Sequence, residues 1–286
     1  MSVPQLIKWI GNKTKYSNEI VSLMPEEINT YIEPFLGSGA VLATLLQHEK
    51  QICGRKVNKA IASDSLAPLI GIFQLVKDDP EKIIEYYSDV ITKFYNDRNN
   101  IYLEVRDRFN QNQNPFDFLI LSRTCYSGVI RFRKNDGYMS TPIGPHKPIS
   151  PEAFRKRAEI WSQLLKKVDL YNEDYREIIK KAGPGDLIYC DPPYTHSQSI
   201  LYGAQAFNID DLWTSIREAK NRGAKIMLSL NGKNKSEKND ISTPIPVGLF
   251  ERNIFIDCGI SMINRLQKSG EIMEEEQVHD MLLLTW

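Results

Sequence analysis

The chain has 286 residues, of which 42% are hydrophobic and 25% are charged, a composition typical of a globular protein with one large domain carrying an insertion, or with two small domains. Its 36 basic residues balance its 36 acidic residues, so the formal net charge is zero. Zero net charge argues against a protein that coats nucleic acid non-specifically, but it leaves room for a local basic face.

Cysteine spacing and hydropathy exclude further classes. The four cysteines are scattered without a C-x-x-C pair, which argues against a zinc site and a disulfide framework. No stretch approaches the roughly 20 apolar residues of a membrane span. Lys8 and the polar and charged residues within 12–19 interrupt the N-terminal region, so no signal peptide is expected. We therefore expect an intracellular protein without a metal site.

The first part of the chain has the pattern of two strand–helix units. The first unit comprises a strand at 30–35, a glycine turn at 36–39 and a helix at 40–46. The second comprises a strand at 59–64 and a helix at 66–76. Two successive units of this kind predict a parallel sheet.

The pattern changes after Asp78. Residues 81–110 have the pattern of one amphipathic helix and residues 116–123 that of another, whereas the Gly-, Pro- and Arg-rich residues 125–150 predict a loop or hairpin. We interpret 78–150 as a helical and β-hairpin insertion in an α/β fold.

Alternating helices and strands return from Pro151 onward. In chain order we expect a helix at 152–165, a strand at 168–171, a helix at 175–181, a strand at 186–190, a helix at 209–222, a strand at 225–230 and a last strand at 278–286. The prediction is an α/β fold with a mixed, mostly parallel sheet.

The motif Glu33–Gly39 spans the end of the first strand and the two-glycine turn that follows it. Glycine lets a ligand approach the backbone, and open α/β sheets bind ligands at the carboxyl ends of their strands. Val41 and Leu42 follow where a dinucleotide fingerprint needs a third glycine, which favours a ligand without phosphates, such as S-adenosylmethionine (AdoMet). Asp64, after the second strand, could accept hydrogen bonds from ribose hydroxyls. A turn without a ligand and a helix cap at Asp64 remain open.

The strand at 186–190 leads directly into Asp191-Pro192-Pro193-Tyr194. The two N–H groups of an amine can be accepted by the Asp191 carboxylate and by a backbone carbonyl, which the prolines hold rigidly. Tyr194 offers a face for stacking on a base. The motif predicts an amine acceptor whose lone pair is directed at a sulfonium methyl group. The alternative is a Pro-rich turn with a capping Asp.

These motifs, in this order, resemble the Dam-like D12 class, or alpha group, of DNA N6-adenine methyltransferases. The similarity covers most of the chain and implies a Rossmann-like AdoMet-dependent methyltransferase fold. Besides the motifs above, three segments carry it. They are Lys8-Trp9-Ile10-Gly11-Asn12-Lys13, similar to the family's K-W-x-G-x-K; Arg123–Phe132, similar to its R-x-x-Y-N-G-x-x-R-Y; and Asp174-Tyr175.

The resemblance implies methyl transfer from AdoMet to the N6 amine of a flipped-out adenine in a specific double-stranded DNA sequence. Residues 1–77 and 151–286 would form the catalytic domain and residues 78–150 the target-recognition subdomain. Lys13 would lie near the AdoMet carboxylate. The implied catalytic residues are Asp191, Pro192, Pro193 and Tyr194. The implied AdoMet-binding residues are Trp9, Lys13, Phe35, Gly37, Gly39, Asp64, Asp174, Tyr175 and Asp191.

DNA contacts are expected in and beside the basic segment 131–157. Tyr126 would wedge into the duplex, and Arg131 would read a guanine edge. The other expected DNA-binding residues, several of them on phosphates, are Ser127, Arg133, Lys134, Lys147 and Arg155. Ser127 stands where the family commonly has Asn, so no recognition sequence carries over. A solvated basic face is the alternative.

Three other functions stay open. An N4-cytosine enzyme usually has Ser in place of Asp191, an RNA or protein methyltransferase of this fold usually has Asn, and a catalytically inert DNA-binding module is the third. A C5-cytosine mechanism is discarded, because no cysteine lies in a Pro-Cys turn. We expect a cytoplasmic, bacterial or phage-encoded monomer or weak dimer, with a cognate restriction endonuclease as a candidate partner.

Overall fold

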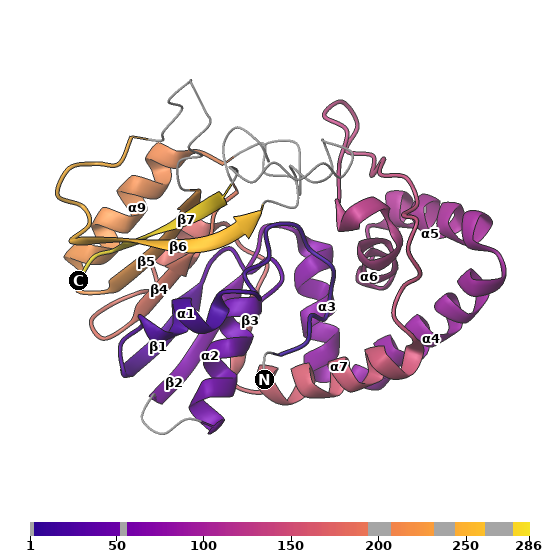
Figure 1. Ribbon diagram of the computed structural model, residues 1–286, viewed down its shortest axis with the longest axis horizontal. Helices are drawn as coiled ribbons and strands as arrows, with labels where there is room; N and C mark the ends of the chain where they lie inside the picture. The colour runs from indigo at the N-terminus through magenta and orange to yellow at the C-terminus, as the bar shows by residue number, and fades with distance from the viewer. Residues whose placement is uncertain (1–2, 52–55, 194–206, 232–243, 261–276) are drawn as a thin grey trace.

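The computed structural model describes residues 3–51, 56–193, 207–231, 244–260 and 277–286, which form two lobes (Figure 1). The larger lobe contains a seven-stranded sheet in the order β3-β2-β1-β4-β5-β7-β6. The strands are β1 (Glu27–Glu33), β2 (Lys56–Ser63), β3 (Val168–Tyr171), β4 (Leu187–Cys190), β5 (Lys225–Asn231), β6 (Arg252–Ile260) and β7 (Gln277–Leu284). β1 to β5 pair in parallel, and β7 is antiparallel to both β5 and β6. The predicted mostly parallel α/β sheet is confirmed.

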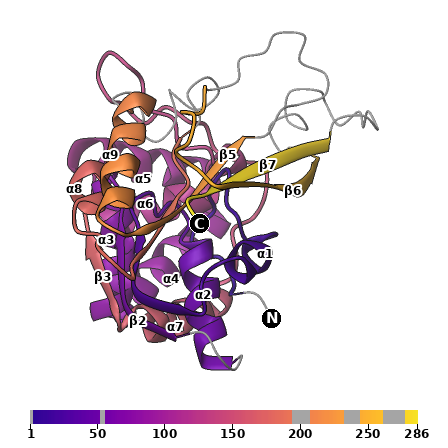
Figure 2. The ribbon, with the colours of Figure 1, turned by 90° about the vertical axis from the view of Figure 1, so that its left-hand side faces the viewer.

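Helices cover both faces of this sheet (Figure 2). One face carries α1 (Ser17–Ser22), α2 (Ala40–Gln51), α3 (Ala67–Asp78) and α7 (Pro151–Leu165), and the other carries α8 (Tyr175–Ile179) and α9 (Ile209–Asn221). Side chains alternate between the two faces along each strand. Tyr31 therefore packs in the core on the face covered by α1, α2, α3 and α7, and Ile32 packs in the core on the face covered by α8 and α9. No helix of the described residues has both the length and the apolarity needed to cross a membrane.

The second lobe comprises α4 (Pro80–Asn96), α5 (Arg98–Asn112), α6 (Pro115–Thr124), the short 3₁₀ helix η1 (Tyr126–Gly128) and an irregular hairpin after it. The hairpin is held by Arg133 N donating to Tyr138 O at 2.9 Å and by Ser140 N donating to Arg131 O at 3.0 Å. Apolar side chains of α4, α5 and α6 belong to the same core cluster as those of α2. The two lobes therefore share one continuous core.

Three features differ from the predicted elements. The predicted helix at 81–110 is helical but interrupted, because the chain breaks at Asp97 (φ −142°, ψ 78°), whose carboxylate accepts a hydrogen bond from Asn100 N and caps α5. Helix α1 was not predicted, since six residues are too few to show a helical period. Strand β6 was also missed; Phe255 is exposed on this edge strand, which blurs the expected alternation.

The topology of the sheet places the functional segments together. The chain continues from β1 toward β2 on one side and from β4 toward β5 on the other, so the strand order reverses between the neighbours β1 and β4. Ligand crevices in open α/β sheets form at this reversal, at the carboxyl ends of the strands. The glycine loop follows β1 and Asp191 follows β4, so both lie at this crevice.

Candidate active site

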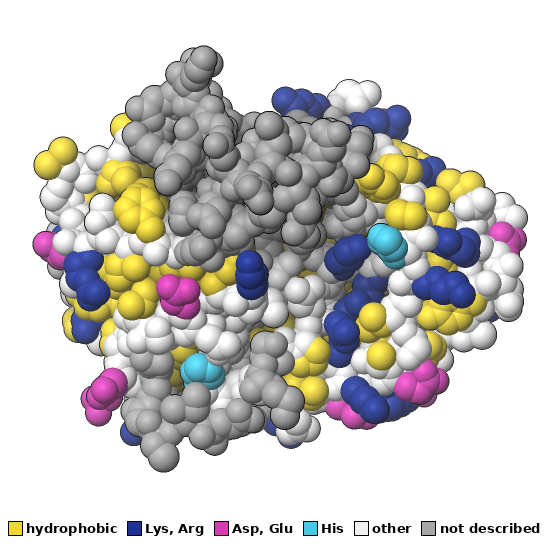
Figure 3. Space-filling model, viewed as in Figure 1, with side chains coloured by type: hydrophobic (Ala, Val, Ile, Leu, Met, Phe, Trp, Pro, Cys, Tyr) yellow, Lys and Arg dark blue, Asp and Glu magenta, His cyan; other side chains and the backbone are white. Residues whose placement is uncertain are grey.

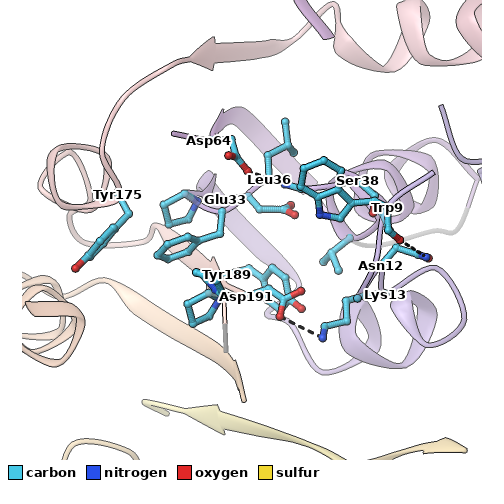
Figure 4. Close-up of a pocket in the computed structure, with 18 of the residues that line it drawn as sticks. Trp9, Asn12, Lys13, Glu33, Leu36, Ser38, Asp64, Tyr175, Tyr189 and Asp191 are labelled. Carbon is cyan, nitrogen blue, oxygen red and sulfur yellow. Dashed lines mark hydrogen bonds and ion pairs between the residues drawn. The ribbon is translucent and has the colours of Figure 1, made fainter. Parts of the chain in front are cut away.

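A cavity at this edge of the sheet is lined by well-separated parts of the chain (Figure 4). Of the residues proposed from the sequence, it brings together Trp9, Lys13, Phe35, Gly37, Asp64, Asp174, Tyr175, Asp191, Pro192 and Pro193. Lining residues that the sequence analysis did not select include Asn12, Glu33, Ser38, Tyr189 and Phe207. Tyr194 lies outside the described residues.

The two glycines of the loop have different surroundings. Both have positive φ, +49° at Gly37 and +68° at Gly39, which favours glycine over any residue with a Cβ. A Cβ at Gly37 would lie 3.0 Å from Trp9 Nε1, in the cavity wall. A Cβ at Gly39 would lie 2.9 Å from the Trp161 ring of α7, and Gly39 is not among the described lining residues. Gly37 therefore shapes the cavity, whereas Gly39 permits core packing.

Asp64 ties the glycine loop to the end of β2. Its Oδ2 accepts a hydrogen bond from Gly37 N at 3.0 Å, and its Oδ1 accepts one from Leu66 N at 3.1 Å. The side chain does not cap α3, whose N-cap is Leu66. Burial raises the pKa of the Asp64 carboxyl. Each carboxylate oxygen has a second lone pair, so Asp64 can still accept hydrogen bonds from a ligand.

Three aromatic rings form one wall of the cavity. Phe35 stacks on Tyr175 with ring centroids 5.0 Å apart, and Phe207 meets Phe35 at 5.9 Å and Tyr175 at 5.8 Å. Phe207 precedes α9 and has no motif around it, so only its packing reveals it. Beside this wall Asp174 pairs with Arg176 at 2.8 Å, and this hydrogen-bonded guanidinium lowers the pKa of the Asp174 carboxyl. The wall suits a planar, apolar ligand face.

Lys13 is buried among carboxylates. Its Nζ lies 3.1 Å from Asp191 Oδ1 and 2.9 Å from Asp280 Oδ2, and the Asp191 contact is drawn in Figure 4. The sequence analysis placed Lys13 near the carboxylate of the methyl donor and did not connect it with Asp191. Asp280 was missed entirely, since it lies 267 residues away in β7 and belongs to no recognised motif.

Glu33, the last residue of β1, has a buried carboxyl group and lines the cavity. Tyr31 Oη donates a hydrogen bond of 2.7 Å to Glu33 Oε2. Burial raises the pKa of Glu33 to about 8, and the nearby negative charge of Asp191 adds to the rise. A pKa this high favours the protonated form of Glu33 at neutral pH, unlike that of an exposed glutamate.

Glu33→Gln is expected to remove one component of the pH dependence of stability. The folded pKa of about 8 exceeds the ordinary value of 4.5, so the folded state binds the proton more tightly, and wild-type stability falls as pH rises between these values. The uncharged isostere lacks this fall. Urea unfolding from pH 5 to 8.5 should show the variant gaining stability relative to wild type with pH; a constant difference would contradict the expectation.

The predicted DNA-binding residues lie on the second lobe and the segment after its hairpin, except Arg155, which lies on α7. Figure 3 shows Lys and Arg side chains gathered over this lobe. Tyr126 is 43% exposed, and Ser127 beside it has the left-handed φ of +56° that Asn adopts more readily. Ion pairs hold Arg133 to Asp136 and Arg155 to Glu81, but in the described part of the chain none involves Arg131, Lys134 or Lys147.

Comparison with known proteins agrees with this geometry. The family model of the D12 class N6 adenine-specific DNA methyltransferases matches residues 9–279. The type II methyltransferase M.MjaIII of Methanocaldococcus jannaschii is 34% identical over 80% of this chain and 84% of its own length. A DNA adenine methylase of Vibrio cholerae is 27% identical over 78% and 79% of the two chains. The chain therefore belongs to the D12 class of DNA methyltransferases, enzymes that methylate the N6 amine of adenine in DNA.

Proposed function

We propose that the enzyme methylates a flipped-out adenine within a specific double-stranded DNA sequence, with AdoMet as the methyl donor. The observation that carries the proposal is one cavity that contains Asp191 after β4, the glycine loop after β1 and Asp64 after β2. Base flipping is required because the N6 atom of a stacked base cannot reach the donor in line.

The cavity has the chemistry that a nucleoside-type donor requires. AdoMet, when bound, supplies an electrophilic methyl group on a sulfonium. The aromatic wall of Phe35 and Tyr175 suits the adenine ring, and the Asp64 carboxylate can accept hydrogen bonds from ribose hydroxyls. Gly37 leaves room beside Trp9 that a Cβ would take. Lys13 and Asp174 complete the proposed donor site, and Gly39 contributes to it through its packing on Trp161.

Asp191 is proposed to hold the target amine. Its Oδ1 contacts Lys13, and this contact directs Oδ2 toward the target amine, where it accepts one amine hydrogen. The Pro192 carbonyl accepts the second amine hydrogen. Accepting both hydrogens turns the nitrogen lone pair toward the donor. Tyr194 is assigned to stacking on the base through the family resemblance alone. Pro193 keeps the backbone rigid.

Residues 78–150 are proposed as the target-recognition subdomain and residues 1–77 with 151–286 as the catalytic domain. The exposed Tyr126 is assigned to the duplex wedge, Arg131 to base reading, and Ser127, Arg133, Lys134 and Lys147 to the surrounding contacts. The M. jannaschii relative is named a type II methyltransferase, which supports a restriction-modification or related role with a cognate endonuclease. Cytoplasmic location remains part of the proposal.

Arg131→Ala is expected to weaken binding to the cognate sequence about 5- to 150-fold and to relax specificity at one base pair, because a bidentate Arg–guanine contact is worth about 1–3 kcal/mol. The matched control is Lys147→Ala, which should weaken binding to all sequences alike and reduce the salt slope by about one. Binding titrations on single-base variants of the site distinguish them. Uniform weakening by Arg131→Ala would assign Arg131 to a phosphate instead.

Expression in methylation-deficient cells, followed by base-resolution mapping, tests the function. We expect one sequence motif with N6-methyladenine. Mass spectrometry of the digested nucleosides provides an independent identification of the product. N4-methylcytosine would show that the acceptor assignment is wrong, and absence of AdoMet binding by calorimetry would favour an inert DNA-binding module.

A further inference from the structure

Lys13, Asp191 and Asp280 form a charged cluster that includes one carboxylate without a proposed role. Lys13 and Asp280 are only 5% and 6% exposed, and Asp280 is not among the described residues that line the cavity. We propose that Asp280 is a positioning residue for methyl transfer, which holds the Lys13 ammonium against one oxygen of Asp191 and so orients the other oxygen toward the target amine. This inference rests on the role proposed above for Asp191.

The antiparallel course of β7 explains how Asp280 reaches the site. At the end of β4, Cys190 pairs with Leu228 of β5, and three residues further along β5 Asn231 pairs with Asp280. Because β7 is antiparallel to β5, the first half of β7 lies at the edge of the sheet where the parallel strands end, which is the edge at which Asp191 also lies. In a wholly parallel sheet the start of this strand would lie at the opposite edge.

Side-chain alternation places the cluster on one face of the sheet. Tyr189 and Leu282, each two residues from a carboxylate of the cluster, pack in the same core. The side chains of Asp191, directly after β4, and of Asp280, within β7, therefore lie on this face, which is also the face covered by α1. Lys13 lies just before α1, so its side chain reaches both carboxylates.

A buried ammonium requires charge partners, and Asp191 alone would be an imperfect one. The lysine side chain has four flexible carbon–carbon bonds and adopts the position that its partners define. Asp280 is a fixed partner, since the backbone around it is paired on both sides, with Asn231 of β5 and Ile256 of β6. An ammonium held at Asp280 constrains Asp191 Oδ1. Loss of this hold weakens the restraint on the Asp191 carboxylate, and a misplacement of about 1 Å in a reacting group can cost about 100-fold in rate.

Asp280→Asn tests the proposal, because it keeps the side-chain shape but removes the charge. We expect kcat to fall about 10- to 100-fold, while KM for DNA and the calorimetric Kd for AdoMet change less than about threefold. Asp280→Glu should recover part of kcat. The matched control is Asp169→Asn, which breaks the exposed Lys59–Asp169 pair (2.8 Å) and should leave kcat unchanged. Unchanged kcat in folded Asp280→Asn, or a loss explained wholly by a raised Kd, would overturn the proposal.

A double variant tests whether Asp280 acts on Asp191 through Lys13. This test can still be made if Asp280→Asn alone fails to fold. Lys13→Met/Asp280→Asn removes both charges and leaves no unpaired ammonium. If Asp280 acts only through Lys13, this variant and Lys13→Met have the same kcat within about threefold. A further tenfold loss in the double variant would refute the proposal.

Asp191→Ala distinguishes a failure of the proposed function from a failure of the role proposed for Asp280. Near-normal turnover in Asp191→Ala would refute the proposed function on which the role of Asp280 rests. An inactive Asp191→Ala together with a fully active Asp280→Asn would refute only the role of Asp280.

Discussion

Asp191→Ala is expected to lower kcat by at least about 100- to 1,000-fold, the effect of removing one preorganised polar group from a reacting centre. Alanine removes both acceptor oxygens, so nothing at this position turns the amine lone pair toward the donor. The fold should survive, because Lys13 keeps Asp280 as its partner at 2.9 Å. The measurement is transfer of labelled methyl groups from AdoMet to DNA, in single-turnover conditions.

AdoMet binding supplies the control for this variant. Calorimetry should still detect the donor, since Trp9, Phe35 and Asp64 are unchanged. Thermal unfolding near the wild-type temperature would confirm that the fall in kcat comes from the methyl-transfer step and not from unfolding of the variant. A variant that turns over at near the wild-type rate would show that Asp191 is not the residue that holds the amine.

Asp117→Ala is expected to lower the free energy of unfolding by about 3 kcal/mol, because it removes a fully buried charge from a network that joins three helices. Asp117 in α6 accepts hydrogen bonds from Arg108 Nε of α5 at 2.8 Å, from Tyr86 of α4 and from Asn114 Nδ2 at 2.6 Å. Each donor loses its acceptor in the variant. Since Arg108 is partly exposed, the effect should lie at the lower end of the range for broken buried pairs.

Urea unfolding measures this effect, and Asp107→Ala is the matched control. Asp107 lies on α5, is exposed, and accepts one hydrogen bond from Tyr138 Oη at 3.0 Å, so its loss should change stability by less than about 0.5 kcal/mol. Weakened DNA binding in Asp117→Ala at temperatures where the protein stays folded would connect this network with the recognition surface. A loss below about 1 kcal/mol would show that solvent replaces the missing carboxylate.

Local patterns were sufficient to predict the mostly parallel α/β sheet, and the order of the motifs carried the resemblance to the family. A strand followed by glycines and a helix is specified by neighbouring residues, through backbone freedom at Gly37 and apolar periodicity after it. The apolar run before Asp191 also shows that this residue follows a buried strand. Because parallel strands end at one edge of a sheet, Asp191 is then expected at the ligand-binding edge. These predictions needed no knowledge of contacts between distant residues. The helix break at Asp97 is also caused by neighbouring residues, but it was missed because the helical pattern continues on both sides of this capping residue.

Which charges meet beside Asp191 depends on contacts between distant parts of the chain. Asp280 comes beside Lys13 because one strand enters the sheet antiparallel, and no local pattern reports the direction of a strand. The raised pKa of Glu33 depends on its burial and on the nearby charge of Asp191, which are properties of the packed core. Position 39 requires glycine because a Cβ there would meet the Trp161 ring, which belongs to a helix distant in the sequence. The sequence alone thus determined the reaction class, whereas the three-dimensional packing decided how its central carboxylate is held, because desolvation and pairing exist only once distant segments are in contact.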